Sequence, residues 1–305
     1  VLRKFMNISG SEGLVAAGNI FMGMTESPVL IKNYLPTMNR SEIFLVMVSG
    51  MGTIAGSVMG TYIGMLGGTD PASKVLFATH LLSASVMAVP GSIVLAKMLC
   101  PQTEEATDHV AVSGKEKENS NILDAISSGT VTGVKLMTNI AAMLLVFISL
   151  VALANYVTED VIGRYTGLND WIVQISDGKA KGLTFQFILG VITAPFMWLI
   201  GVPGQDIMLV GSLLGQKTIL NEFVAYFQLQ QWKDAGLFMY EKSILMSTYI
   251  LCGFANISSI GILLGGLGVL APEKRGLISR IGVPAMIGGA LVSVLSATII
   301  GMILG

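Results

Sequence analysis

Six long stretches without a charged side chain limit what this chain can fold into. None of them contains Asp, Glu, Lys or Arg, and they cover residues 43–69, 75–96, 136–158, 182–205, 244–272 and 281–305. Each is about as long as the roughly 20 residues that a helix needs to cross the hydrocarbon of a bilayer. A closed β-barrel, the other architecture that spans membranes, would show short segments of alternating polarity instead. The sequence therefore predicts an all-α, polytopic membrane protein.

Composition narrows the class further. Only 12% of the 305 residues are charged, whereas roughly 25% of the residues in a soluble domain are charged. The net charge of −1 offers no electrostatic attraction for a nucleic acid, so we expect no nucleic-acid partner. Cys100 and Cys252 lie in apolar runs, which favours buried thiols over a disulfide or a metal site. The first residue is Val1 and no cleavable signal follows it, so we expect the chain to be the C-terminal part of a longer protein.

The remaining charges lie mostly between the apolar stretches. Lysine and arginine gather within residues 3–40 and 274–280, which predicts that these two regions face the cytoplasm. Residues 101–120 form a hydrophilic loop that divides the chain in two. His109 in that loop and His80 inside a span are isolated, so we interpret both as structural or solvated.

The two halves on either side of this loop follow the same order. Each contains a Glu in a short helical segment, Glu26 or Glu222, and then a span interrupted by small polar residues, over 49–57 or 252–259. A Gly-Gly pair and a final apolar span come next in both halves. Internal symmetry of this kind is typical of inverted-repeat secondary transporters with broken transmembrane helices.

The segments around the two Glu residues, 19–26 and 215–226, are too short and too polar to cross a membrane alone. Two re-entrant helical hairpins would resolve this, because non-helical backbone survives at membrane depth only where protein or a water-filled cavity satisfies it. A carboxylate at that depth is costly and marks a functional site, so Glu26 and Glu222 are candidate binding residues. An apolar pocket with a few polar groups suits a small, uncharged, polyhydroxylated solute, and Phe254 could stack on a planar ring.

Structural roles compete with some of these interpretations. Thr53, Ser57 and Ser258 can bond back to their own helix or pack against a neighbour, as Ser and Thr commonly do in membranes. Asp206, in the sequence V-P-G-Q-D, is expected to cap the helix that follows it. Glu222 is harder to explain in this way, because its burial would demand specific partners.

Three motifs resemble those of a known family. The run G-Q-K-T-I-L-N-E-F-V-A-Y over residues 215–226 is similar to the signature G-x-K-x-x-x-N-E-F-V-A of the concentrative nucleoside transporters. G-N-I-F-M-G-M-T-E-S-P over 18–28 and C-G-F-A-N-I-S-S-I-G over 252–261 resemble the other two characteristic segments of that family. The resemblance covers essentially the whole chain. It implies a homotrimer of multi-pass protomers in the inner (plasma) membrane, with further spans upstream of this chain.

The resemblance also implies how the chain is divided. A first repeat with hairpin 1 and two spans would cover residues 1–100, and a polar loop with an interfacial helix would cover 101–133. A scaffold span would follow over 134–158. The second repeat, with an interfacial helix, hairpin 2 and two spans, would cover 159–305. The hairpins and broken spans of the two repeats would form a transport domain that moves against the scaffold.

The same resemblance implies the binding residues. The ribose of a nucleoside would be held by Glu222, Asn256 and Ser259. The base would meet a group of residues from the first hairpin and the broken spans, namely Met24, Thr25, Glu26, Val58 and Phe254. A cation site would be formed by Asn19, the Met22 carbonyl, Thr53 and the Ile54 carbonyl. Proton-coupled relatives tend to lack the Asn that corresponds to Asn19, so the presence of Asn19 favours Na⁺ as the coupling ion. The resemblance implies no cofactor.

One position departs from the family, which usually has Gln where this chain has Met24. Met offers only a weak acceptor on a flexible apolar stem, so we expect base recognition to be looser or tuned to a different nucleoside. Other functions stay open: H⁺-coupled transport of a nucleoside or of a related small polar solute, and an intramembrane enzyme that uses the two Glu residues as acid and base. The sequence lacks an H-E-x-x-H motif and a carboxylate cluster for a metal, which argues against the enzyme.

Overall fold

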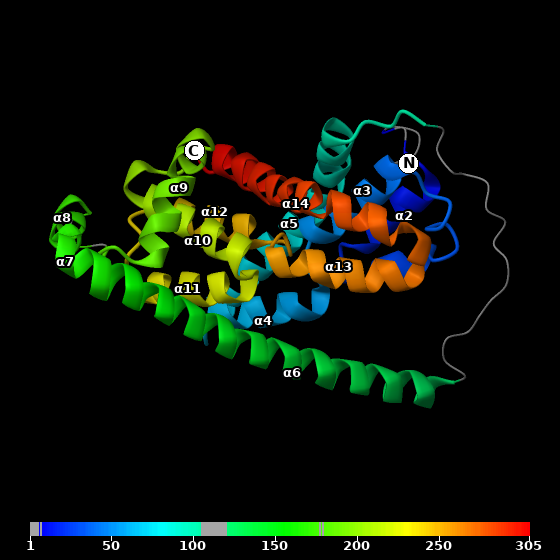
Figure 1. Ribbon diagram of the computed structural model, residues 1–305, viewed down its shortest axis with the longest axis horizontal. Helices are drawn as coiled ribbons and strands as arrows, with labels where there is room; N and C mark the ends of the chain where they lie inside the picture. The colour runs from blue at the N-terminus through cyan, green and yellow to red at the C-terminus, as the bar shows by residue number, and fades with distance from the viewer. Residues whose placement is uncertain (1–5, 7, 105–120, 177, 179) are drawn as a thin grey trace. The chain divides into compact units, whose positions relative to one another are not determined.

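The computed structural model describes residues 6, 8–104, 121–176, 178 and 180–305, and these residues contain helices but no strand. The chain divides into two compact units, which are described separately. The larger unit joins Val1–Val110 to Leu189–Gly305, and the smaller unit is Ala111–Ile188. Figure 1 shows the helices by their labels.

The first part of the larger unit contains α2 (Gly10–Gly18), η1 (Ser27–Ile31), α3 (Arg40–Gly52), α4 (Gly56–Gly67) and α5 (Pro71–Leu99). Its second part contains α9 (Phe185–Leu199), which begins just before the unit boundary, η3 (Gly204–Asp206), α10 (Ile207–Ile219), α11 (Glu222–Asp234), α12 (Glu241–Leu251), α13 (Ile257–Leu270), η4 (Pro272–Lys274) and α14 (Arg275–Ile303).

Side chains next to the helix starts fix where the helices begin. Asn39 and Glu42 form a capping box at α3, in which Asn39 Oδ1 accepts from Glu42 N at 3.0 Å and the Glu42 carboxylate accepts from Asn39 N at 2.9 Å. Asp70 caps α5 by accepting hydrogen bonds from Ser73 Oγ, Ser73 N and Ala72 N. The bond from the Ser73 hydroxyl, more than the other two, lowers the pKa of the Asp70 carboxyl. All three bonds act in this direction because they favour the ionised form of the carboxyl.

Three helical segments of the described chain are long and apolar enough to cross a bilayer: Arg40–Gly67, Pro71–Leu99 and Pro272–Ile303. The helices α9 and α13 are also apolar but shorter. The prediction of an all-helical membrane protein with several apolar spans is confirmed. The charge-free stretches 43–69 and 244–272 are not continuous helices, because each is interrupted near its middle, at residues 53–55 and 252–256.

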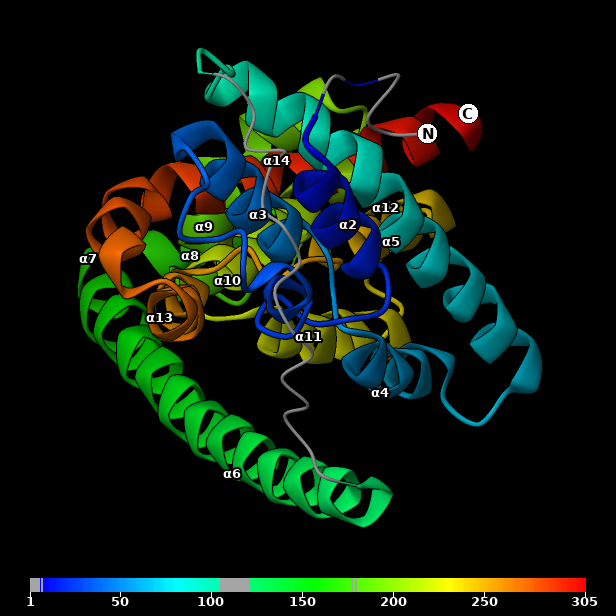
Figure 2. The same ribbon diagram turned by 90° about the vertical axis from the view of Figure 1, so that its right-hand side faces the viewer.

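The helix α3 lies at the centre of the larger unit. The most apolar window of Arg40–Gly67 is 72% buried inside the protein, against 44% for each of the other two spans. The long α14 packs along α3, behind which it lies in Figure 2, and also contacts α5, α12 and α13. The helices α10 and α11 pack against each other and are joined only by Leu220 and Asn221. Helices from both parts of the sequence therefore contribute to both hydrophobic clusters of the larger unit.

The smaller unit consists of α6 (Ile122–Asn155), η2 (Tyr156–Gly163), α7 (Arg164–Thr166) and α8 (Leu168–Ile175). Asn169 ties its segments together, because its Nδ2 donates to the Glu159 carbonyl at 3.0 Å and its Oδ1 accepts from Leu183 N at 2.9 Å. Asn155 Oδ1 accepts a hydrogen bond from Phe185 N at 2.8 Å and so fixes the start of α9. The segment 134–158, expected to be a scaffold span, lies within α6 and the first residues of η2.

Candidate functional site

Two interruptions in the helices meet at the centre of the larger unit. One separates α3 from α4 at Thr53–Ala55, and the other separates α12 from α13 at Cys252–Asn256. Phe254 N donates a hydrogen bond to the Thr53 carbonyl at 3.2 Å, which joins the two breaks through the backbone. Gly253 has a φ of 152°, and a methyl group on it would lie 2.9 Å from the Met51 carbonyl oxygen, so only glycine permits this approach.

Glu222 on α11 is hydrogen-bonded to a side chain of α4 and to a side chain of the second break. It is the first residue of α11, whose amino-terminal end is capped by Asn221, and it is only 8% exposed. Tyr62 Oη donates to Glu222 Oε1 at 3.2 Å, and Asn256 Nδ2 donates to Glu222 Oε2 at 2.9 Å. Each carboxylate oxygen therefore has a donor from a different helix, as a buried anion requires.

Asn256 orients the polar groups at the start of α13. It is the N-cap residue of that helix, and its Oδ1 accepts from Ser259 N at 2.9 Å, from Ser259 Oγ at 3.0 Å and from Ser258 Oγ at 2.6 Å. Because Oδ1 is occupied by these donors, Nδ2 points to Glu222. The structure thus brings together the three residues expected to hold a ribose: Glu222, Asn256 and Ser259.

Lys217 supports the second break from α10. It is completely buried, and its Nζ donates to the Ile250 carbonyl at 2.8 Å and to Ser293 Oγ at 3.0 Å. Ser293 Oγ in turn donates to the Cys252 carbonyl at 2.9 Å. These donors satisfy carbonyls left free where α12 ends, at the negative end of the helix dipole.

The residues expected to bind a cation gather around the first break. Asn19 is completely buried, and its Nδ2 donates to Ser49 Oγ at 2.9 Å, while Thr53 Oγ1 donates to the Ser49 carbonyl at 3.0 Å. Asn19 Oδ1 is buried and has no hydrogen-bond partner among the described residues. A buried oxygen without a donor is costly unless something else binds it. An amide oxygen beside unwound backbone fits a small, hard cation such as Na⁺. Ile54 is also fully buried, and Met22 is half-buried.

Two of the residues expected to meet the base, Met24 and Thr25, lie against α3 and α13. Met24 is 7% exposed, and a methyl group on Gly50 of α3 would lie 2.9 Å from Met24 Cβ, so glycine is what allows this close contact. A methyl group on Gly266 of α13 would lie 3.1 Å from Thr25 Cγ2, which places Thr25 against that helix.

Three further base-site candidates differ in their surroundings. Val58 and Phe254 are half-buried, and Phe254 packs against both hydrophobic clusters of the larger unit. Glu26 is exposed, and its side chain makes no capping hydrogen bond at η1. Within the described part of the chain, none of the residues 24–26 takes part in the hydrogen-bond network of Glu222. The two Glu residues that looked equivalent in the sequence therefore have different environments.

The expected role of Asp206 is wrong in one respect. Asp206 is buried at the N-cap position of α10, but its side chain makes no capping hydrogen bond to that helix. Its carboxylate accepts from Met239 N at 3.0 Å and from Tyr240 N at 3.1 Å. Asp206 thus fixes the approach to α12 through two backbone donors that lie 33 and 34 positions away in the sequence.

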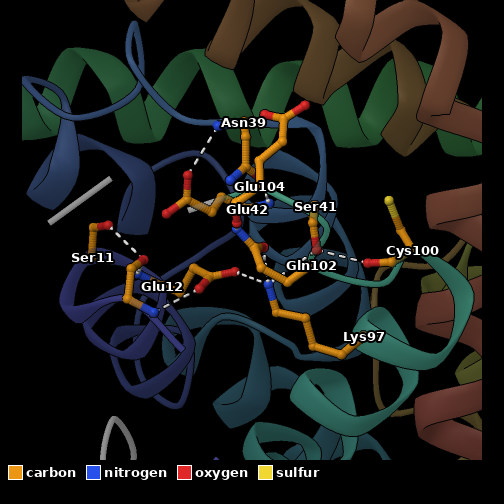
Figure 3. Close-up of polar contacts among 10 residues, drawn as sticks. Ser11, Glu12, Asn39, Ser41, Glu42, Lys97, Cys100, Gln102 and Glu104 are labelled. Atoms are coloured by element: carbon orange, nitrogen blue, oxygen red, sulfur yellow. Dashed lines mark hydrogen bonds and ion pairs between the residues drawn. The ribbon is translucent and has the colours of Figure 1, made fainter. Parts of the chain in front are cut away.

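A second polar cluster surrounds Lys97 and had no counterpart in the sequence predictions. Lys97 Nζ donates to Glu12 Oε1 at 2.6 Å, to Ser41 Oγ at 3.0 Å and to Gln102 Oε1 at 2.8 Å, as Figure 3 shows. Glu12 also accepts from Ser9 N at 2.8 Å. One ammonium group therefore ties α2, the start of α3 and the end of α5 together.

A cavity of about 360 Å³ opens beside the Lys97 cluster. It is lined by Asn39, Arg40, Ser41, Leu99, Cys100, Pro101, Thr103 and Glu104. None of these residues belongs to the group around Glu222, so the cavity is separate from the candidate site.

Sequence reasoning missed two parts of the candidate site. Lys217 belongs to the motif over residues 215–226, but it was assigned no role from the sequence. A lysine within an apolar region is itself a signal of function or of a specific partner. Tyr62 carried no local signal, because its contact with Glu222 bridges 160 positions of sequence.

Comparison with known proteins shows which family the chain belongs to. The model for the Na⁺-dependent nucleoside transporter C-terminus matches residues 80–301, and a nucleoside recognition (Gate) model matches residues 1–69. The chain is 39% identical over 307 residues to an uncharacterized transporter of Haemophilus influenzae, covering 100% of this chain and 68% of that protein. It is 37% identical to the nucleoside permease NupC of Helicobacter pylori, again with 100% and 68% covered.

Solved structures agree with these matches. The transporter CNTnw, in an inward-facing substrate-bound state, superposes with a TM-score of 0.82 at 36% identity, covering 100% of this chain and 68% of that chain. A variant of CNTnw in an outward-facing state gives a TM-score of 0.84 at 35% identity, with 99% and 67% covered. By sequence and by structure, the chain belongs to the concentrative nucleoside transporter family, and it is a transporter rather than an enzyme.

Proposed function

We propose that this protein imports nucleosides by symport with a cation, Na⁺ being favoured, through alternating access. The observation that carries the proposal is the buried carboxylate of Glu222, held by Asn256 at 2.9 Å beside the α13 start and by Tyr62 at 3.2 Å. A carboxylate has room for about four hydrogen bonds. Among the described residues, Tyr62 and Asn256 fill two of these positions, and the others would accept from the hydroxyl groups of a sugar.

The ribose would be held from two sides. Its hydroxyl groups would donate to Glu222, forming charge-assisted hydrogen bonds that are stronger than neutral ones. Asn256 and Ser259 would complete the ribose site, since both are buried and already linked to each other. The negative charge of Glu222 favours a neutral, hydroxyl-rich nucleoside over an anionic nucleotide, because like charges repel.

The base would lie toward the first hairpin. Met24, Thr25 and Glu26 come from that segment, Val58 comes from α4, and Phe254 lies in the second break itself. Phe254 is half-buried, which leaves part of its ring open for stacking. Met24 can offer the base only apolar contact and a weak acceptor, so we expect this chain to discriminate between bases less sharply than relatives with Gln there.

The coupling ion would bind where α3 ends. The support is Asn19 Oδ1, a buried oxygen without a donor among the described residues, close to the break that carries Thr53 and Ile54. The Met22 and Ile54 carbonyls and the Thr53 hydroxyl would supply further oxygen ligands. The relative named sodium/nucleoside cotransporter 1 of Rattus norvegicus, 39% identical over 99% of this chain and 46% of its own length, also favours Na⁺.

We infer the architecture from the same elements. The pair α10–α11 and the segment from α2 to η1 would be the two re-entrant hairpins of an inverted repeat. The first repeat would cover 1–100, the loop and interfacial helix 101–133, the scaffold span 134–158 and the second repeat 159–305. A homotrimer in the plasma membrane is the assembly that fits a scaffold carrying mobile transport domains.

One experiment tests substrate and ion together. Uridine uptake is measured in liposomes that contain the purified transporter, with Na⁺ or with choline outside, at two pH values. We expect uptake to need Na⁺ and to be independent of a proton gradient. Uptake in choline that follows the proton gradient would point to the H⁺-coupled alternative. Competition by bases or sugars, with no effect of nucleosides, would point to a different solute.

A further inference from the structure

Tyr62 links α4 to the candidate substrate carboxylate. Its side chain is completely buried, and its hydroxyl donates to Glu222 Oε1 at 3.2 Å. Its ring stacks on Tyr226 of α11 with centroids 4.1 Å apart and meets Phe223 edge-on at 6.0 Å. The ring is therefore held in place by packing, so that the hydroxyl reaches the carboxylate in one orientation.

We propose that the Tyr62 hydroxyl is a positioning group for Glu222 and that it transmits the effect of the bound cation to the nucleoside site. This rests on the proposed function, since it requires both a cation at the first break and a nucleoside at Glu222. Tyr62 itself touches neither ligand.

The argument begins with the place of Tyr62 on its helix. The helix α4 begins at Gly56, directly after the break that carries Thr53 and Ile54. Its amino-terminal end is anchored by a hydrogen bond of 2.9 Å from Gly56 N to the Phe21 carbonyl, in the segment that also carries Asn19. A cation bound to this break fixes the start of α4. Since a helix is rigid over two turns, it also fixes Tyr62.

A second connection runs in parallel through the backbone. Phe254 N donates to the Thr53 carbonyl, and two residues later Asn256 donates to Glu222 Oε2. The break that would hold the cation is therefore connected to both oxygens of Glu222, to Oε1 through Tyr62 and to Oε2 through Asn256. Two donors from separate elements define the plane of the carboxylate. If one is lost, the carboxylate can rotate away from the sugar.

If Tyr62 acted only by packing, its hydroxyl would not be needed. Phenylalanine would keep the stack on Tyr226 and lose only the hydroxyl. Tyr226 provides a matched control in the same stack, because its own hydroxyl donates to the Thr248 carbonyl at 2.9 Å and makes no hydrogen bond to Glu222. Comparing Tyr62→Phe with Tyr226→Phe therefore separates the contact with Glu222 from the general effect of removing a buried hydroxyl.

The test measures the uridine Kd of the purified transporter in saturating Na⁺ and in choline, together with the melting temperature with and without Na⁺. In Na⁺ we expect Tyr62→Phe to weaken uridine binding roughly 10-fold, the size of one hydrogen bond to a charged acceptor. In choline the change should be no more than about 2-fold, because α4 is then not fixed by the ion. Stabilisation by Na⁺ alone should stay as in the wild type. Tyr226→Phe should leave both values of Kd within about 2-fold of the wild type.

Several results would overturn the proposal. Equal weakening in Na⁺ and in choline would show that Tyr62 does not transmit the effect of the ion. An unchanged Kd in Tyr62→Phe, or the same loss in Tyr226→Phe, would remove the positioning role. Loss of stabilisation by Na⁺ would mean that the variant damages the cation site itself. Failure of the proposed function is recognised separately, because the wild-type protein would then bind no uridine or would bind it equally well with and without Na⁺.

Discussion

The backbone nitrogen of Phe254 donates a hydrogen bond to the carbonyl oxygen of Thr53, 3.2 Å away. This bond joins the interruption between α3 and α4 to the one between α12 and α13, which lie in different halves of the sequence. Interrupted helices leave carbonyl and amide groups without their helical partners, and these groups are costly at membrane depth unless satisfied. The two breaks therefore stabilise each other.

Glu222→Gln is expected to weaken nucleoside binding by at least roughly 100-fold, because a neutral amide replaces an acceptor that bonds both to the protein and to the sugar. The amide nitrogen of Gln would also face a donor, either Tyr62 Oη or Asn256 Nδ2. Uridine binding to the purified protein measures this. Glu241→Gln is the control, since Glu241 is also the first residue of a helix but is exposed. Retained binding in Glu222→Gln would contradict the assignment.

Met24→Gln is expected to sharpen discrimination between nucleosides in favour of the pyrimidines. Gln has nearly the length of Met and brings a donor and an acceptor to the base. The close contact of residue 24 with Gly50 involves Cβ, Cα and the carbonyl oxygen, which both residues share. Relative uptake of uridine, cytidine and adenosine is the measurement. Met24→Leu should keep the wild-type order, because it adds no polar group. The same order of uptake in all three proteins would count against a role of residue 24 in base recognition.

Asn19→Ala is expected to raise the Na⁺ concentration for half-maximal uptake by roughly 10-fold or more, since it removes the buried Oδ1 proposed to bind the ion. Ser49→Ala removes the partner of Asn19 Nδ2 and leaves Oδ1 in place, so its effect should be smaller. Uptake at a series of Na⁺ concentrations, with choline keeping the ionic strength constant, compares the two. An equal or larger effect of Ser49→Ala would mean that the hydrogen bond, and not the free oxygen, is what matters.

Lys97→Met is expected to destabilise the protein by roughly 3 kcal/mol, because it leaves the buried carboxylate of Glu12 without its cation. Thermal unfolding in detergent measures the effect. Lys181→Met removes an exposed lysine and should leave the melting temperature nearly unchanged. A melting temperature of Lys97→Met equal to that of the wild type would show that the ion pair contributes little.

Much of this protein could be predicted from the sequence because the controlling forces act locally. A charged side chain at the centre of a bilayer is so unfavourable that the charge-free runs reveal membrane helices without any knowledge of their neighbours. Small polar residues and glycines inside two of these runs likewise marked the places where the helices break. Glu222 was singled out in the same way, because a buried acid in an apolar chain demands partners. Asn256 and Ser259 were assigned through the resemblance of three motifs to a known family.

Tertiary structure decided which partners those residues have. The hydroxyl of Tyr62 reaches Glu222 across 160 positions, and Asp206 is bonded to residues 33 and 34 positions away instead of to the helix it precedes. Glu26 and Glu222 occupy similar places in the two halves, yet one is exposed and the other is only 8% exposed. Local pattern fixes where a helix runs and where it breaks. Hydrogen bonds between distant segments depend on how whole helices pack, and packing is settled only when all of them are in place.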